Sequence, residues 1–154
     1  MIQVDIEGSF FDLDQYELTE KVLGSGSFGK VQVVKKKSDD LLFAAKTIFL
    51  NSKFDTKFQI SFMRESFLMK SLDHPAIVRF YGMNFSSFEN RNSLEPTILM
   101  EYLSNDSLDK VLEKERKGRA PNKWTNATKY ICLLGVSHAM NYLHQKQIIH
   151  RDLK

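Results

Sequence analysis

The stretch Leu23–Val34, LGSGSFGKVQVV, decides which fold this sequence can adopt. Its glycines follow the pattern G-x-G-x-x-G, which permits a tight turn whose backbone amides can approach phosphate oxygens. Dinucleotide-binding folds use the same spacing, but there a helix follows the last glycine. Here the valine-rich KVQVV follows, and this composition indicates a strand. The stretch therefore predicts a glycine-rich β-hairpin, although taken alone it equally fits a hairpin with no ligand.

The segments around this hairpin predict an α+β arrangement. Residues 16–50 are rich in β-branched and large apolar residues, which suits a three-stranded antiparallel meander with a turn at 38–40. Helical spacing follows over about 55–72, and HPAIVRFYGMNF and PTILMEYL then predict two more strands around a polar loop. We expect five antiparallel strands and one main helix.

The remainder of the chain has a helical pattern. A short helix is predicted at 108–117 and a long one at 125–147, separated by a basic turn with Gly118 and Pro121. The predicted domains are an extension at 1–15, a small lobe at 16–103 and the start of a mostly helical lobe at 104–154. Apolar residues surround too much of the long helix for one buried face, so we expect other helices or a partner to cover it. They are Tyr130, Ile131, Leu133, Leu134, Val136, Met140 and Leu143.

Composition excludes several classes of protein. The 154 residues carry a formal net charge of +3 without a concentrated basic arm, which argues against nucleic acid and membrane surfaces as partners. The single cysteine, Cys132, lies in the apolar run YICLLGV and is expected to pack as a small hydrophobe. No basic leader and no run of about 18 apolar residues is present. We therefore expect a cytoplasmic protein.

A lysine and a glutamate in apolar surroundings predict an ion pair. Lys46 ends a predicted strand where alternation turns its side chain inward, and a buried ammonium needs an anion. The next helix carries a stripe made of Phe58, Phe62, Glu65, Met69 and Leu72. A carboxylate within this stripe is costly unless paired, so Glu65 and Lys46 are expected within about 4 Å of each other. A solvated lysine, with Glu65 at the edge of the stripe, is the alternative.

The motifs LGSGSFGKV, AAK, the helical glutamate, HPAIV, ILMEYL and HRDLK, in this order over residues 16–154, resemble a eukaryotic protein kinase catalytic domain. The resemblance implies that the glycine-rich loop covers the ATP phosphates, that Lys46 holds the α and β phosphates, and that Glu65 braces Lys46. It implies a nucleotide-binding set of Leu23, Gly24, Ser25, Gly26, Ser27, Phe28, Gly29, Val31, Ala44, Lys46, Met100, Glu101 and Leu103. Val31 and Ala44 would line the adenine pocket, Met100 would be the gatekeeper, and residues 101–103 would offer backbone hydrogen bonds to adenine.

The motif HRDLK supplies the implied catalytic residues. Asp152 would orient the acceptor hydroxyl and accept its proton, and Lys154 would stabilise the transferring phosphoryl group. Lys154 fits the serine/threonine pattern, since many tyrosine kinases have alanine or arginine there. The expected partners are thus ATP and a protein substrate. Without the resemblance, HRDLK could be no more than a solvated charged terminus.

The resemblance also implies parts that this sequence lacks. A metal-binding asparagine and an Asp-Phe-Gly motif would follow Lys154, so the ligands of Mg²⁺ are expected beyond it. We therefore expect the amino-terminal portion of a kinase domain, inactive by itself. Three alternatives are a pseudokinase or nucleotide-binding regulatory module, an interaction scaffold, and a tyrosine-specific or tyrosine-kinase-like enzyme, which Lys154 opposes. A scaffold would need neither the glycine loop nor Lys46 and Glu65.

Overall fold

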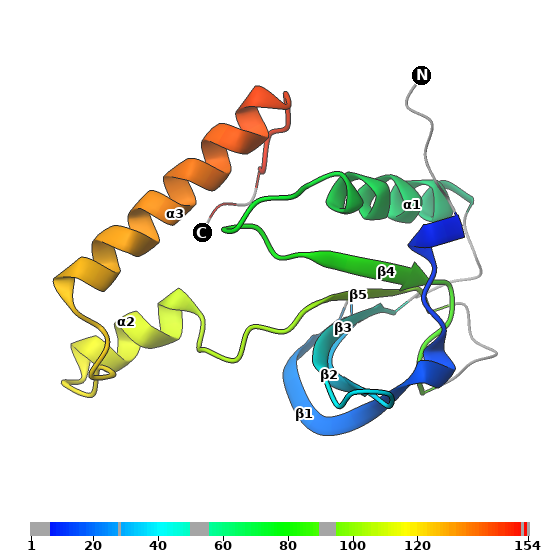
Figure 1. Cartoon of the computed structure of the whole chain (residues 1–154), viewed down its shortest axis with the longest axis horizontal. Helices are drawn as coiled ribbons and strands as arrows, with labels where there is room; N and C mark the ends of the chain where they lie inside the picture. The colour runs from blue at the N-terminus through cyan, green and yellow to red at the C-terminus, as the bar shows by residue number, and fades with distance from the viewer. Residues whose placement is uncertain (1–6, 28, 50–55, 90–94, 152, 154) are drawn as a thin grey trace. The chain divides into compact units, whose positions relative to one another are not determined.

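The computed structural model describes residues 7–27, 29–49, 56–89, 95–151 and 153 (Figure 1). The chain divides into two compact units. The first comprises Met1–Asp73 and Val78–Tyr102, and the second comprises His74–Ile77 and Leu103–Lys154.

The first unit is built on a five-stranded antiparallel sheet, as predicted. Its strands are β1 (Tyr16–Gly26), β2 (Gly29–Lys36), β3 (Leu42–Ile48), β4 (Phe80–Asn84) and β5 (Thr97–Glu101). They lie in the order β1-β2-β3-β5-β4. The first three strands form the expected meander, and Asp40, with a φ of 58°, adopts the left-handed conformation in the turn between β2 and β3.

Alternation along the strands creates an apolar cluster on each face of the sheet. On one face, Phe11 and Leu13 pack with side chains from β2, β3 and β5. On the other, Phe62 of helix α1 (Thr56–Lys70) packs with Met83 and Ile98. Burial of each large side chain stabilises the fold by roughly 1.5–3 kcal/mol. The predicted main helix therefore covers one face of the sheet, and residues ahead of β1 cover part of the other.

Residues 8–15, ahead of β1, include two buried side chains of this packing, Phe11 and Leu13. Two short 3₁₀ helices, η1 (Glu7–Ser9) and η2 (Leu13–Gln15), lie along the sheet. The side chain of Asp12 caps η2 by accepting the Asp14 N–H at 2.9 Å. These residues belong to the same compact unit as the sheet.

The strand predicted from HPAIVRFYGMNF is shorter than expected, because only Phe80–Asn84 pairs with the sheet. Pro75 has no backbone N–H to donate to a ladder. The Ala76 N–H instead donates to Nδ1 of His74 at 3.1 Å, and the Ile77 N–H donates to the His74 carbonyl at 3.0 Å. This turn places His74–Ile77 in the second unit.

The second unit contains two helices, α2 (Leu108–Arg116) and α3 (Asn126–Gln145), close to the predicted bounds. Thr125 caps α3 by accepting the Thr128 N–H at 3.3 Å. Glu115 of α2 pairs with Lys129 of α3 and accepts a hydrogen bond from Nε1 of Trp124 at 2.9 Å. Hydrogen bonds from Lys129, which has the larger effect, and from Trp124 lower the pKa of Glu115.

Helix α3 exposes much of its apolar surface. Tyr130, Ile131, Leu133 and Leu134 are 69, 67, 64 and 58% exposed. Ala139 and Leu143 are buried, and the Tyr142 ring lies 5.1 Å from the His74 ring. Among the described residues, no helix is both long and apolar enough to cross a membrane.

Ser66 of α1 supports a prediction about stability. It is fully buried, and within the described part of the chain its hydroxyl has no hydrogen-bond partner. A buried hydroxyl without a partner is destabilising, and alanine is also the better helix former. Ser66→Ala is expected to raise the free energy of unfolding, measured in urea, by about 0.5–2 kcal/mol. Ser61→Ala, at an exposed position of α1, controls for helix propensity, and a loss of stability specific to Ser66→Ala would contradict the prediction.

Candidate functional site

The strand register brings four predicted nucleotide-binding residues to one face of the sheet. Val31 of β2 lies directly opposite Lys46 of β3, and Ala44 of β3 lies opposite Met100 of β5. Residues opposite each other share a face, as do Ala44 and Lys46, which are two positions apart. Lys46 is also opposite Ile98, whose side chain contacts the cluster beneath α1. The face that carries these residues is thus the face that α1 covers.

Lys46 and Glu65 form the predicted pair. The Lys46 Nζ lies 3.8 Å from Oε1 of Glu65. The expected burial is wrong, however, because the two side chains are 43% and 51% exposed. The buried line of α1 runs through Phe62 and Ser66, and Glu65 lies about 100° around the helix from Ser66. The pair is therefore partly solvated and contributes no more than about 1 kcal/mol to stability.

The three glycines of the hairpin differ in what they do. A Cβ at Gly29 would lie 2.4 Å from the backbone oxygen of Thr47, so β3 leaves no room for a side chain. A Cβ at Gly24 or Gly26 would meet nothing within 4 Å. Of these three positions, only position 29 therefore requires glycine for the fold. The open space at Gly24 and Gly26 is what a phosphate group approaching the backbone needs, so these residues fit ATP.

This difference predicts separable effects of alanine substitution. Gly29→Ala is expected to lower the free energy of unfolding by about 1–3 kcal/mol, because β2 or β3 must move to relieve the clash. Gly24→Ala is expected to leave it unchanged or raise it by up to about 1 kcal/mol. Urea unfolding of the two variants measures the difference. Equal losses of stability in both would contradict the assignment of Gly29 to the fold.

The residues at the end of β5 already make hydrogen bonds within the protein. The backbone N–H of Glu101 donates to the Arg79 carbonyl at 2.8 Å, so this N–H is not available to a ligand. The Glu101 carboxylate accepts the Arg79 N–H at 3.3 Å. Leu103 is exposed and belongs to the second unit.

The other residues of the predicted set lie in or near the hairpin or outside the described residues. Leu23 and Ser25 of β1 and Ser27 in the turn are exposed. Phe28, Asp152 and Lys154 fall outside the described residues. Within the described ranges, no group of three acidic, histidine or cysteine side chains could hold a metal ion.

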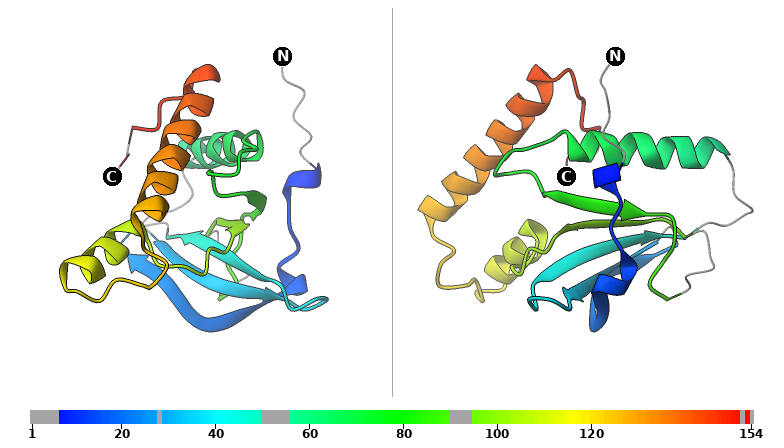
Figure 2. Two further views of the ribbon diagram at one scale, coloured as in Figure 1. Left: turned by 60° about the vertical axis from the view of Figure 1, so that its left-hand side comes forward. Right: turned by 45° about the vertical axis from the view of Figure 1, so that its right-hand side comes forward.

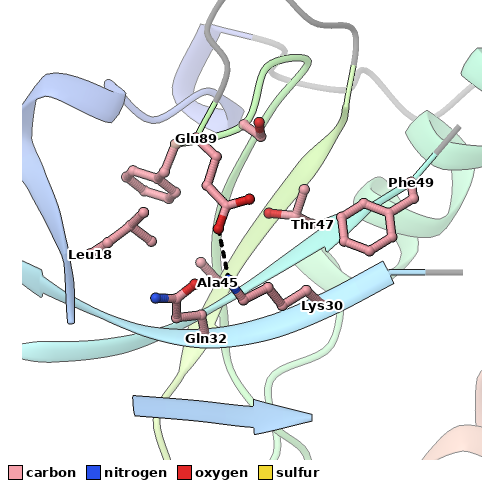
Figure 3. A pocket seen from close by; sticks show the side chains of 9 residues that line it. Leu18, Lys30, Gln32, Ala45, Thr47, Phe49 and Glu89 are labelled. Carbon is pink, nitrogen blue, oxygen red and sulfur yellow. Dashed lines mark hydrogen bonds and ion pairs between the residues drawn. The ribbon is translucent and has the colours of Figure 1, made fainter. Parts of the chain in front are cut away.

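A pocket on the opposite face of the sheet was not predicted from the sequence (Figure 3). Gln32, Ala45 and Thr47 line it, in register positions that alternate with those of the face that carries Lys46. At its side, Nζ of Lys30 lies 2.7 Å from Oε1 of Glu89. Lys30 follows Gly29 directly, so this pair links the hairpin to the segment after β4. Only strand alternation indicates in the sequence that Lys30 faces away from Lys46, and nothing there indicates Glu89 as its partner.

The sheet, its covering helix, the glycine hairpin and the lysine–glutamate pair are the parts of a protein kinase small lobe. A family model described as "Protein kinase domain" matches residues 16–154. The chain belongs to the protein kinase family.

Individual relatives agree with this assignment. The chain is 34% identical over 142 residues to an Aurora kinase of Debaryomyces hansenii, covering 92% of this chain and 31% of that protein. It is 38% identical over 136 residues to the MAP kinase kinase MKK1/SSP32 of Saccharomyces cerevisiae, covering 86% of this chain and 25% of that protein. It is 31% identical over 141 residues to the probable serine/threonine-protein kinase nek1 of Dictyostelium discoideum, covering 92% and 27%. The chain thus spans about a quarter to a third of the length of these relatives.

Proposed function

We propose that this chain is the ATP-binding portion of a longer protein kinase, which transfers the γ-phosphate of ATP to serine or threonine residues of proteins. The observation that carries this proposal is the Lys46–Glu65 pair at 3.8 Å, on the same sheet face as Val31 and Ala44. An interaction scaffold would have no use for this combination.

In the proposed complex, each group of residues has a separate task. The backbone amides around Gly24 and Gly26 bind phosphate oxygens, where no Cβ intervenes. Lys46 binds the α and β phosphates, and Glu65 holds the Lys46 ammonium toward them. Val31, Ala44 and Met100 contact the adenine side of the nucleotide, and the backbone groups of residues 101–103 other than the Glu101 N–H supply hydrogen bonds to the base.

Specificity for serine and threonine is supported by the chain and by its relatives. Lys154 matches the serine/threonine pattern, and the Dictyostelium relative is named as a probable serine/threonine-protein kinase. Asp152 would orient the acceptor hydroxyl and take its proton. The proposed use of ATP, which cells keep inside, and the presence of a single cysteine both suit an intracellular location.

Phosphoryl transfer is proposed to need more residues than this chain supplies. Mg²⁺, when bound, neutralises charge on the β and γ phosphates during the transfer. The described residues present no cluster of ligands for it. We therefore propose that the chain alone does not transfer phosphate, and that the metal ligands belong to the longer protein.

The experiment that tests this function has two measurements on the full-length protein. Isothermal titration with ATP and with adenosine tests nucleotide binding and the contribution of the phosphates. Transfer of ³²P from ATP to peptides that differ only in serine, threonine or tyrosine tests the activity and its specificity. Binding without transfer would identify a pseudokinase, transfer to tyrosine alone would contradict the serine/threonine assignment, and no binding would overturn the proposal.

A further inference from the structure

Residues 9–11, ahead of β1, continue a row of register partners that crosses neighbouring strands of the sheet and includes Lys46. Lys46 is opposite Ile98 of β5, and Ile98 is opposite Met83 of β4. Met83 in turn forms a parallel bridge with Phe10. We call residues 9–11 the strap. The strap therefore lies beyond β4 in the same row as Lys46.

Backbone and side-chain contacts fix the strap on β4. The Phe11 N–H donates to the Met83 carbonyl at 3.2 Å, and Nδ2 of Asn84 donates to the Phe11 carbonyl at 3.0 Å. A Cβ at Gly82 would lie 3.1 Å from Cβ of Phe11 and 3.3 Å from the Ser9 carbonyl oxygen. The missing side chain at Gly82 thus allows the strap its close approach to the strand.

The strap contacts α1 directly at a position after Glu65 along the helix, and it reaches the helix before Glu65 through Phe85. Nζ of Lys70, five residues after Glu65, donates to the hydroxyl of the fully buried Ser9 at 2.9 Å. Three residues before Glu65, the Phe62 ring lies 5.8 Å from the Phe85 ring. The Phe85 ring is also 5.8 Å from Phe10. Both views of Figure 2 show the dark blue segment beside α1 and β4.

We propose that the strap positions α1, so that Glu65 stays within reach of Lys46. The Lys46–Glu65 pair is half exposed, and such a pair is too weak to hold a helix in one place. The strap adds contacts to the same helix: the fully buried Ser9 accepts a hydrogen bond from Lys70, and Phe10 packs on Phe85, which packs on the buried Phe62. Ser9, Phe10 and Lys70 are therefore positioning residues, and displacement of the strap would release α1 and separate the pair. This inference rests on the proposed kinase function only for its effect on activity.

The first test measures phosphotransfer by full-length variants. Phe10→Ala and Lys70→Met are each expected to lower kcat/KM about tenfold, because less of the protein has the pair in place. In a Glu65→Gln background, the same changes are expected to cause no further loss, since the residue through which they act is gone. Equal losses in both backgrounds would mean general damage to the fold, and no loss in the parent would mean that the strap does not position α1. Either result overturns the inference.

A matched control is available in the same sheet. Leu42 is 45% exposed, close to the 42% of Phe10, and lies at the start of β3. Its register partner is Lys35, well away from the Lys46 row. Leu42→Ala is expected to leave kcat/KM within about twofold of the parent. A loss as large as that of Phe10→Ala would count against a specific role for the strap.

The second test does not depend on activity. Hydrogen exchange of the α1 amides around Glu65 is expected to be about tenfold faster in Phe10→Ala and in Lys70→Met, and unchanged in Leu42→Ala. Unchanged exchange in the first two variants overturns the inference even if the protein is an active kinase. Faster exchange supports it even if the protein transfers no phosphate, so that failure of the strap and failure of the proposed function can be told apart.

Discussion

Replacement of Asp152 by asparagine should abolish phosphoryl transfer in the full-length protein and leave its affinity for ATP nearly unchanged. In the proposed mechanism this carboxylate acts on the hydroxyl of the protein substrate and not on the nucleotide. Asparagine has the same size but cannot accept the proton, and loss of a general base typically costs about 10²–10⁴-fold in rate. Single-turnover transfer rates and ATP titration of the same preparation measure the two quantities separately.

Lys46→Met is the companion variant and should show a different combination of effects. Turnover and ATP affinity are both expected to fall, since Lys46 is proposed to bind the phosphates. The free energy of unfolding should change by less than about 1 kcal/mol, because the pair with Glu65 is half exposed. Lys36→Met removes a lysine that pairs with Asp39 beside the turn between β2 and β3, and it should keep full activity. Normal turnover in both the Asp152 and the Lys46 variant would rule out the kinase mechanism.

The second large effect concerns the 154-residue chain produced alone. It is expected to aggregate, bind hydrophobic dye or require a partner, because α3 exposes four large apolar side chains at 58–69%. Burial of each would contribute roughly 1.5–3 kcal/mol, against about 5–15 kcal/mol for the stability of a typical domain. Dye fluorescence and sedimentation velocity measure this directly.

A variant on α3 separates its apolar surface from other causes of aggregation. Leu133→Glu with Leu134→Lys replaces two of the four side chains by charged ones, and it should reduce dye binding without changing the sheet. His138→Ala, at an exposed polar position of the same helix, should have no effect. If the parent chain were a monomer with a cooperative thermal transition and low dye binding, the requirement for a covering partner would be wrong.

Much of the first unit could be predicted because its signals are local. Strand composition, the turn at residues 38–40 and the helical stripe each depend on neighbouring residues, and five strands and a covering helix resulted. The Lys46–Glu65 pair was predictable because a charged group among apolar residues needs a partner. The exposure of this pair was not predictable, because a step of one residue along the helix turns a side chain by about 100°, from the centre of an apolar stripe to its edge.

Other features depend on contacts between distant parts of the sequence. The hydrogen bond between Lys70 and Ser9 joins residues 61 positions apart, and that between Lys30 and Glu89 joins residues 59 apart. Lys30 belongs to the glycine-rich motif, but no motif includes Glu89, Lys70 or Ser9. The shortening of β4 depends on one turn, in which Pro75 and the imidazole of His74 compete with strand pairing. Asp152 and Lys154 lie outside the described residues, and their roles stay predictions.

The residues ahead of β1 also show that the match to the family model and the region that folds together begin at different residues. The match starts at residue 16, whereas Phe11 and Leu13 already fill one face of the sheet. The strap binds the Met83 carbonyl of β4 and bridges this strand at the edge of the sheet, where a strand of another molecule could otherwise pair. A gene fragment that begins where the family match begins would thus remove two core side chains and expose a sheet edge that can pair with other molecules. The physical boundary of this lobe is at least seven residues earlier, at or before Ser9.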